Sequence, residues 1–157
     1  MAKLDNADLR ILRRIQADSS ASLADLADEV GLSSNACWKR LRRLESEGYV
    51  AARVAILDRE KFNLGVTVFV NIKTDQHEDK WLTDFSDSIG RISEVVEFYR
   101  MSGDVDYMLK VVCSSISDYD RIYKKIIRSV KIKDISSFFA MEQIKSTTAI
   151  PIDAIEI

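Results

Sequence analysis

Proline and glycine, the residues that most often interrupt regular structure, are scarce in this chain. One proline and five glycines occur in 157 residues, and no long polar or low-complexity tract is present. Disordered linkers are usually built from such residues. We therefore expect a chain that is folded nearly from end to end, in which any two domains are joined by a short structured segment.

Cysteine and histidine are also scarce, which weighs against metal and redox chemistry. The two cysteines, Cys37 and Cys113, lie far apart in the sequence and form no C-x-x-C pair, and His77 is the only histidine. Zinc sites and redox pairs need closely spaced ligands of these types. We expect reduced thiols, a core position for Cys37, a solvent-exposed His77, and no metal or other cofactor.

Long apolar runs and catalytic motifs are missing as well. No stretch approaches the roughly 20 residues that span a bilayer, and the first five residues lack the pattern of an export signal. No Ser/His/Asp or Cys/His set, no phosphate-binding loop and no dinucleotide fingerprint occurs. The sequence therefore predicts a cytoplasmic protein that does not enter membranes and is not an enzyme; an amino-acid-metabolic enzyme, or its regulatory subunit, is the weaker alternative.

Charge is nearly balanced overall but is unevenly distributed. The formal net charge is −2, with net +1 over residues 1–56 and net −3 over residues 57–157. Between Asn35 and Arg53, five lysines and arginines face only two glutamates. A concentrated basic patch in an acidic protein is typical of nucleic-acid binding, although a solvated helix face is the usual alternative for four clustered cations.

Residues 1–56 predict three short helices. Leu4, Ile11, Leu12 and Ile15 follow helical spacing to about Ala17, with Asp5 or Asn6 as the cap. A second helix starts at Ser22, carries Leu23, Leu26, Ala27 and Val30 on one face, and ends at Gly31. A third helix is capped by Ser33, turns Cys37, Leu41 and Leu44 inward, and stops at Gly48. Two helices joined by a tight turn, the second of them basic, make a helix-turn-helix.

The third helix is the predicted DNA-reading element. The major groove admits one helix, whose first residues reach base edges, so we expect base contacts from Ser34, Asn35 and Trp38. The cations would neutralise phosphates, although Trp38 could instead be half buried against the first helix. The predicted DNA-binding residues are Ser33, Ser34, Asn35, Trp38, Lys39, Arg40, Arg42 and Arg43. Residues 49–56, apolar around Arg53, would form a wing or a connecting strand.

The remaining residues predict an α+β domain of ferredoxin-like βαββαβ form. Strands are expected at 66–73, 95–101, 107–113 and 135–144, and helices at 78–88 and 117–129. Two helices would cover one face of an antiparallel sheet, and apolar residues on the other face suggest dimerisation from sheet to sheet. A homodimer would also let two helix-turn-helix units read the half-sites of a palindromic operator in double-stranded DNA.

The whole chain from Leu4 to Ile152 resembles the Lrp/AsnC family, the feast/famine transcriptional regulators. Motifs that carry the resemblance include Leu4-Asp5 with Asp8, Gly31-Leu32-Ser33, residues 40–45 (RLRRLE) before Gly48, and residues 102–107 (SGDVDY). Residues 37–41 (CWKRL) and 139–145 (FAMEQIK) resemble a subgroup that includes regulators of cysteine breakdown, and cysteine is the effector that this subgroup favours.

The resemblance implies a winged helix-turn-helix, a RAM- or ACT-like ligand-binding module, and dimers that assemble into octamers. It also implies that an amino-acid effector binds near the turn Gly103–Asp106, whose amides would hold a carboxylate while Asp104 or Asp106 pairs with an ammonium. An ordinary hairpin turn also uses Gly-Asp. The predicted ligand-binding residues are Tyr99, Met101, Gly103, Asp104, Asp106, Ser136, Ser137, Thr147 and Thr148.

The expected domains are a DNA-binding domain over residues 1–56, a linker over 57–65, and a ligand-binding and oligomerisation domain over 66–157. The expected function is that of a sequence-specific transcriptional regulator of amino-acid metabolism controlled by a small amino acid. An architectural protein that wraps or bridges DNA without sensing a ligand is the alternative within the same class.

Overall fold

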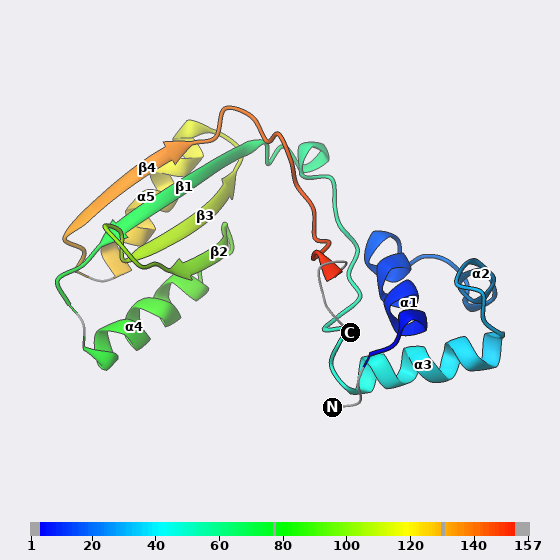
Figure 1. Ribbon diagram of the computed structural model, residues 1–157. Helices are drawn as coiled ribbons and strands as arrows, with labels where there is room; N and C mark the ends of the chain where they lie inside the picture. Colours follow the sequence, from blue (N-terminus) through cyan, green and yellow to red (C-terminus); the bar gives the residue numbers. More distant parts are fainter. Residues whose placement is uncertain (1–3, 77, 130, 153–157) are drawn as a thin grey trace. The chain divides into compact units, whose positions relative to one another are not determined.

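The computed structural model describes residues 4–76, 78–129 and 131–152, so the expectation for His77 lies outside the described residues. The chain divides into two compact units (Figure 1). The first unit runs to Ile56 and includes the C-terminal segment from Lys145, and the second unit is Leu57–Ile144. No helix among the described residues is long and apolar enough to cross a membrane.

Three helices build the first unit: α1 (Asn6–Ala17), α2 (Leu23–Glu29) and α3 (Ser34–Ser46). The predicted caps form, with Asp5 and Asp8 in a reciprocal capping box and Ser22 and Ser33 each accepting a backbone N–H. Gly31 and Gly48 follow α2 and α3 with φ of 71° and 80°, a conformation that glycine adopts without strain. The buried core of this unit comprises Ile11, Leu26, Ala27, Val30, Cys37 and Leu44.

Residues 49–56, expected to form a wing or a connecting strand, contain no strand in the single chain. Residues 51–58 have no regular secondary structure, and Val54 and Ile56 are each 74% exposed. A strand is stabilised by hydrogen bonds to a neighbouring strand, and none of the described residues of this unit is in a strand. The β-favouring residues therefore lie in an extended, exposed segment.

The C-terminal segment belongs to the first unit through specific contacts with α1. The side-chain amide of Gln16 donates to the carbonyl of Ile150 at 3.3 Å and accepts from its N–H at 3.2 Å, and Ile152 is buried. Residues of α1, the segment after α3 and Thr148–Ile152 line a groove of about 510 Å³. The first unit therefore includes the C-terminal segment from Lys145. The sequence had predicted that this segment belongs to the second domain, over residues 66–157.

The second unit has the predicted βαββαβ order. A short 3₁₀ helix, η1 (Arg59–Phe62), precedes β1 (Val66–Lys73), α4 (Asp79–Gly90), β2 (Val95–Arg100), β3 (Tyr107–Cys113), α5 (Ile116–Ser129) and β4 (Asp134–Phe139). The strands are antiparallel in the order β2-β3-β1-β4. The α+β fold class is confirmed.

The helices α4 and α5 cover one face of this sheet (Figure 1). That face buries Val68, Val70, Ile72, Leu109 and Val111 against Phe85 and Ile89 of α4 and Ile122 and Ile126 of α5. Because side chains alternate along a strand, Phe69 and its β4 neighbour Phe138 point to the other face, where Phe138 is 55% exposed.

The last strand is shorter than expected. It ends at Phe139 rather than near residue 144, and the last backbone hydrogen bond to β1 runs from Ala140 N–H to the Thr67 carbonyl. Since β1 begins at Val66, which lies opposite Met141 in this register, β1 has no residue to pair with those after 141. Met141 and Ile144 are exposed beyond this point.

Candidate nucleic-acid interface and effector turn

The third helix begins at a side-chain cap. The Ser33 hydroxyl accepts the backbone N–H of Ala36 at 3.3 Å. Ser34 and Asn35 then occupy the first helical turn, where unpaired N–H groups carry partial positive charge. The hydroxyl of Ser33, one of the predicted DNA contacts, therefore serves the cap.

Five predicted DNA-binding residues share the exposed face of α3. At 3.6 residues per turn they fall on successive turns of one face, opposite the buried Cys37 and Leu44. The five exposed residues are Ser34, Asn35, Trp38, Lys39 and Arg42. This face combines an amide, an indole and two cations, the groups that contact base edges and phosphates.

Trp38 and Arg42 lie together on that face. The Arg42 guanidinium carbon is 5.9 Å from the centroid of the Trp38 ring, and 47% of Trp38 is exposed. Glu45 accepts from Arg42 at 3.3 Å and from Arg53 at 2.9 Å. Trp38 is not among the residues that pack against the buried core of this unit, which favours a role on the outer surface over a ring packed against α1.

Arg40 and Arg43 lie on a different side of α3 and contact α1. Arg40 Nη1 donates to Asp5 at 2.6 Å and to Asp8 at 2.9 Å, and Arg43 Nη2 donates to Asp8. The pKa of Asp5 is lowered by the Asp8 backbone N–H and by Arg40, while Asp5 and Asp8 raise the pKa of Arg40. Two of the cations predicted to contact phosphates are therefore already neutralised within the chain.

The turn between β2 and β3 has a backbone that only glycine adopts easily. Gly103 has φ of 112°, and nothing lies within 4 Å of the position that a Cβ would take. Asp104 is exposed, but Asp106 accepts the Thr74 N–H at 2.8 Å and so ties the turn to the end of β1. Asp104 is thus the freer of the two predicted partners for an ammonium group.

The other predicted ligand residues do not all face the same way. Tyr99 and Met101 are exposed near the turn, and the Tyr99 hydroxyl donates to Glu97 at 2.8 Å. Ser136 pairs with Asn71 and faces away from the helices, whereas Ser137 shares a hydrogen bond with the Tyr119 hydroxyl on the helix side. The expectation that Ser137 lines the same site as Ser136 is therefore wrong, because neighbouring strand residues point to opposite faces.

Thr147 and Thr148 belong to the first compact unit rather than to the unit that holds the turn. Thr147 accepts the Ala149 N–H at 3.0 Å, and Thr148 lines the groove along α1. Their predicted place near the last strand depended on a strand that continues to residue 144. The structure does not bring them together with Gly103 and Asp104 in one unit.

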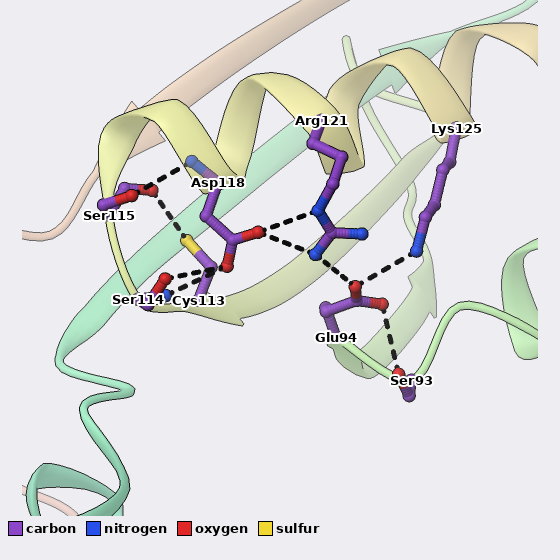
Figure 2. Close-up of polar contacts among 8 residues, drawn as sticks. All are labelled: Ser93, Glu94, Cys113, Ser114, Ser115, Asp118, Arg121 and Lys125. Carbon is purple, nitrogen blue, oxygen red and sulfur yellow. Dashed lines mark hydrogen bonds and ion pairs between the residues drawn. The ribbon is translucent and has the colours of Figure 1, made fainter.

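A charged network fixes the start of β2 to α5 (Figure 2). Glu94 accepts from Arg121 at 2.8 Å and from Lys125 at 3.1 Å, and Arg121 also donates to Asp118 at 2.6 Å. Burial alone would raise the pKa of Glu94, but hydrogen bonds from Arg121, from its own backbone and from Lys125 hold it at about 2. The network positions β2, the strand that leads to the Gly103 turn.

Asp5, Asp8 and Gln16 were missed as site residues in the sequence. The acidic pair at positions 5 and 8 and the basic pair at positions 40 and 43 share a spacing of three residues, which places each pair on one side of its helix. That signal could have suggested ion pairing between α1 and α3. No sequence pattern marks the contact of Gln16 with a backbone 134 positions away.

Comparison with known proteins gives matches over nearly the whole chain. A family model described as the Lrp/AsnC ligand binding domain matches residues 67–150, and a winged helix-turn-helix DNA-binding model matches residues 4–51. The glutamate uptake regulatory protein of Zymomonas mobilis is 47% identical over 96% of this chain and 92% of its own length.

Two solved structures extend the match to three dimensions. An AsnC family transcriptional regulator from Agrobacterium tumefaciens is 52% identical, with a TM-score of 0.93 over 96% of this chain and 98% of that chain. A transcriptional regulator from Neisseria meningitidis, solved as a complex with L-Met, is 28% identical, with a TM-score of 0.91 over the same shares of the two chains.

Proposed function

The chain belongs to the Lrp/AsnC family of transcriptional regulators, and we propose that it binds operator DNA through α3 and senses an amino acid at the Gly103 turn. Members of this family are DNA-binding regulators rather than enzymes, and this chain is one of them. The observation that carries the proposal is the exposed face of α3, which gathers Asn35, Trp38, Lys39 and Arg42 on a capped helix.

The exposed residues divide into two roles. Ser34, Asn35 and Trp38 lie within the first two turns and would contact base edges in the major groove. Lys39 and Arg42 would contact phosphates, where each cation adds affinity by releasing counterions. The sequence predicted phosphate contacts from Arg40 and Arg43 as well. We do not assign them this role, because Asp5 and Asp8 accept hydrogen bonds from Arg40 and Asp8 accepts one from Arg43.

The effector would be an α-amino acid recognised by its two charged ends. The backbone around Gly103 can approach a carboxylate closely, and the exposed Asp104 can pair with the ammonium group. The Neisseria regulator binds L-Met and the Zymomonas relative is named for glutamate uptake, which supports an amino acid as the ligand class. Cysteine, which the subgroup resemblance favours, is one member of that class.

A homodimer formed through the open face of the sheet would place two copies of α3 on a palindromic operator in the cytoplasm. Phe138 and Phe69 provide apolar area on that face. Tetramers of such dimers would give the octamer that the family resemblance implies. Residues up to 56 would then read DNA, and the sheet domain would sense the ligand and assemble.

The DNA-reading role can be tested by comparing Asn35→Ala with Lys39→Gln. Loss of a base contact erodes the preference among DNA sequences, whereas loss of a phosphate contact weakens binding to every sequence and flattens its dependence on salt. The readout is fluorescence anisotropy on a mixed-sequence duplex and on duplexes selected from a randomised pool. Equal losses on both probes for Asn35→Ala would contradict the base contact.

The sensing role can be tested by a thermal-shift screen against the common amino acids, because a ligand that binds the folded state raises its stability. Gly103→Leu should lose the shift and retain DNA binding. Gly90→Ala is the matched control, since Gly90 lies in α4 and nothing meets an added Cβ there. A shift that survives Gly103→Leu would place the effector site elsewhere, and no shift for the native chain would favour an architectural role without sensing.

A further inference from the structure

Asp8 is a charged residue with no exposed surface, and every part of its carboxylate is engaged. Its Oδ1 accepts from Arg40 at 2.9 Å, and its Oδ2 accepts from Arg43 and from the Asp5 N–H, the latter at 3.1 Å. A buried carboxylate is tolerated only when it is paired and hydrogen-bonded. Asp8 therefore needs cations from α3.

The pairing is matched on both helices. Asp5 and Asp8 occur three residues apart at the start of α1, and Arg40 and Arg43 occur three residues apart in the middle of α3. Arg40 bridges both acids, and the Nε of Arg43 is itself buried. The contact therefore joins the two helices around a fully buried carboxylate, with Arg40 and Arg43 each about one third exposed.

We propose that Asp8 is a positioning residue for DNA recognition: its buried carboxylate holds Arg40 and Arg43, so these cations orient α3 instead of contacting phosphates. The inference rests on the proposed DNA-reading role of α3. To bind either arginine, a phosphate of the DNA backbone would have to displace the Asp8 carboxylate, which is already desolvated and hydrogen-bonded to both guanidinium groups. Lys39 and Arg42 face outward on the same helix, and Arg42 is 67% exposed, so they remain for the DNA backbone.

The proposal predicts different effects for Lys39 and Arg43: loss of Lys39 should change the salt dependence of DNA binding, and loss of Arg43 should change the sequence preference. Each phosphate contact contributes about 0.9 to the slope of log affinity against log salt. Lys39→Gln should lower this slope by about 0.9 for each recognition helix that engages DNA, with the selected sequences unchanged. Arg43→Gln should leave the slope unchanged and broaden the set of sequences selected from a randomised duplex pool, because α3 loses part of its anchor.

The experiment uses the full chain, with anisotropy titrations on a mixed-sequence duplex over a range of salt concentrations and selection from the randomised pool. Thermal unfolding verifies that each variant is folded. If Arg43→Gln is not, Arg40→Gln replaces it, since Asp8 then keeps Arg43. A slope lowered by Arg43→Gln as much as by Lys39→Gln, or an unchanged sequence preference, overturns the inference.

The Asp8→Asn background adds a readout that a purely structural role would not move. Without the buried negative charge, Arg43 is free to reach DNA. Arg43→Gln should therefore lower the salt slope in the Asp8→Asn background, although it leaves the salt slope of the native chain unchanged. Should Asp8→Asn not fold, Asp5→Asn paired with Arg40→Gln tests the converse: Asp8 still holds Arg40 in Asp5→Asn, so Arg40→Gln should leave the salt slope unchanged there, and a lowered slope would overturn the inference. Failure of Lys39→Gln to change any slope would instead contradict the proposed function of α3.

Discussion

Single charged residues in this chain act mainly through their partners. Asp8 is paired with two arginines and Glu94 with an arginine and a lysine, and both acids join helices to neighbouring elements. Exposed ion pairs contribute little to stability, whereas acids that are largely removed from water depend strongly on their cations. Loss of the charge on Asp8 or Glu94 should therefore cost more stability than loss of an exposed charge.

Glu94→Gln should destabilise the second unit in a pH-dependent manner. The folded pKa of Glu94 lies at about 2, below its ordinary 4.5, so its stabilisation is complete above pH 4.5 and is lost as the pH falls toward 2. We expect a loss of about 2 kcal/mol at neutral pH, discounted for partial exposure, that shrinks to nothing in strong acid. Urea unfolding at several pH values measures it.

Asp120→Asn is the matched control for that change, because Asp120 pairs with Lys124 on the same helix but is 61% exposed. Its effect should stay below about 0.5 kcal/mol at every pH. A Glu94→Gln cost that is the same at pH 7 and at pH 2 would show that the ion network does not stabilise the fold.

At the scale of elements, the helix boundaries of the first unit were predictable because local signals set them. Asp5, Ser22 and Ser33 cap their helices as their positions in the sequence indicate, and Gly31 and Gly48 follow the helix ends. The end of β4 was not predictable from its own residues, since the start of β1 limits how far β4 can pair. Residues 49–56 favour a strand but pair with no strand in the described part of the chain.

In the candidate site, too, features set by a single helix were predictable and contacts between distant segments were not. The face of α3 could be read from helical spacing, because Asn35, Trp38 and Arg42 need only the geometry of one helix. The ion pairing of Arg40 and Arg43 depends on how α3 packs against α1. The position of Thr147 and Thr148 depends on how the C-terminal segment from Lys145 packs against the first unit. Such contacts between distant segments leave no periodic signal in the sequence.

The packing of the C-terminal tail, the segment from Lys145, against the first unit can be measured. Ile152 is 6% exposed whereas Ile144 is 91% exposed. Ile152→Ala should reduce the free energy of unfolding by about 2 kcal/mol, because truncation of a buried isoleucine leaves a cavity, and should make the tail more sensitive to protease. The same truncation at Ile144 should change stability by less than about 0.5 kcal/mol. Equal effects at both positions would mean that the tail is not docked.

At the scale of the whole molecule, the open sheet face connects folding to assembly. The helices cover one face only, and Phe138 projects from the other. Dimers that bury this face would bring two DNA-reading helices to one operator, which a single helix-turn-helix cannot specify alone. The oligomer is therefore part of the proposed function.

If the proposed dimer forms through this face, Phe138→Glu should convert it to monomers, because a charge would be buried in an apolar interface. Light scattering during gel filtration gives the mass directly. Ile116→Glu is the control, since Ile116 is 71% exposed at the start of α5 rather than on the sheet. An unchanged mass for Phe138→Glu would exclude the open face as the dimer interface.

Coupling between amino-acid binding and DNA binding can be measured by titrating DNA into this protein in the presence of each common amino acid. The probes are duplexes that the protein itself selects from a randomised pool. We expect at least one amino acid to change the apparent affinity by about fivefold or more, the usual lower range of allosteric coupling, and to raise the thermal stability. If no amino acid at millimolar concentration alters either quantity, the coupling between the two activities is contradicted.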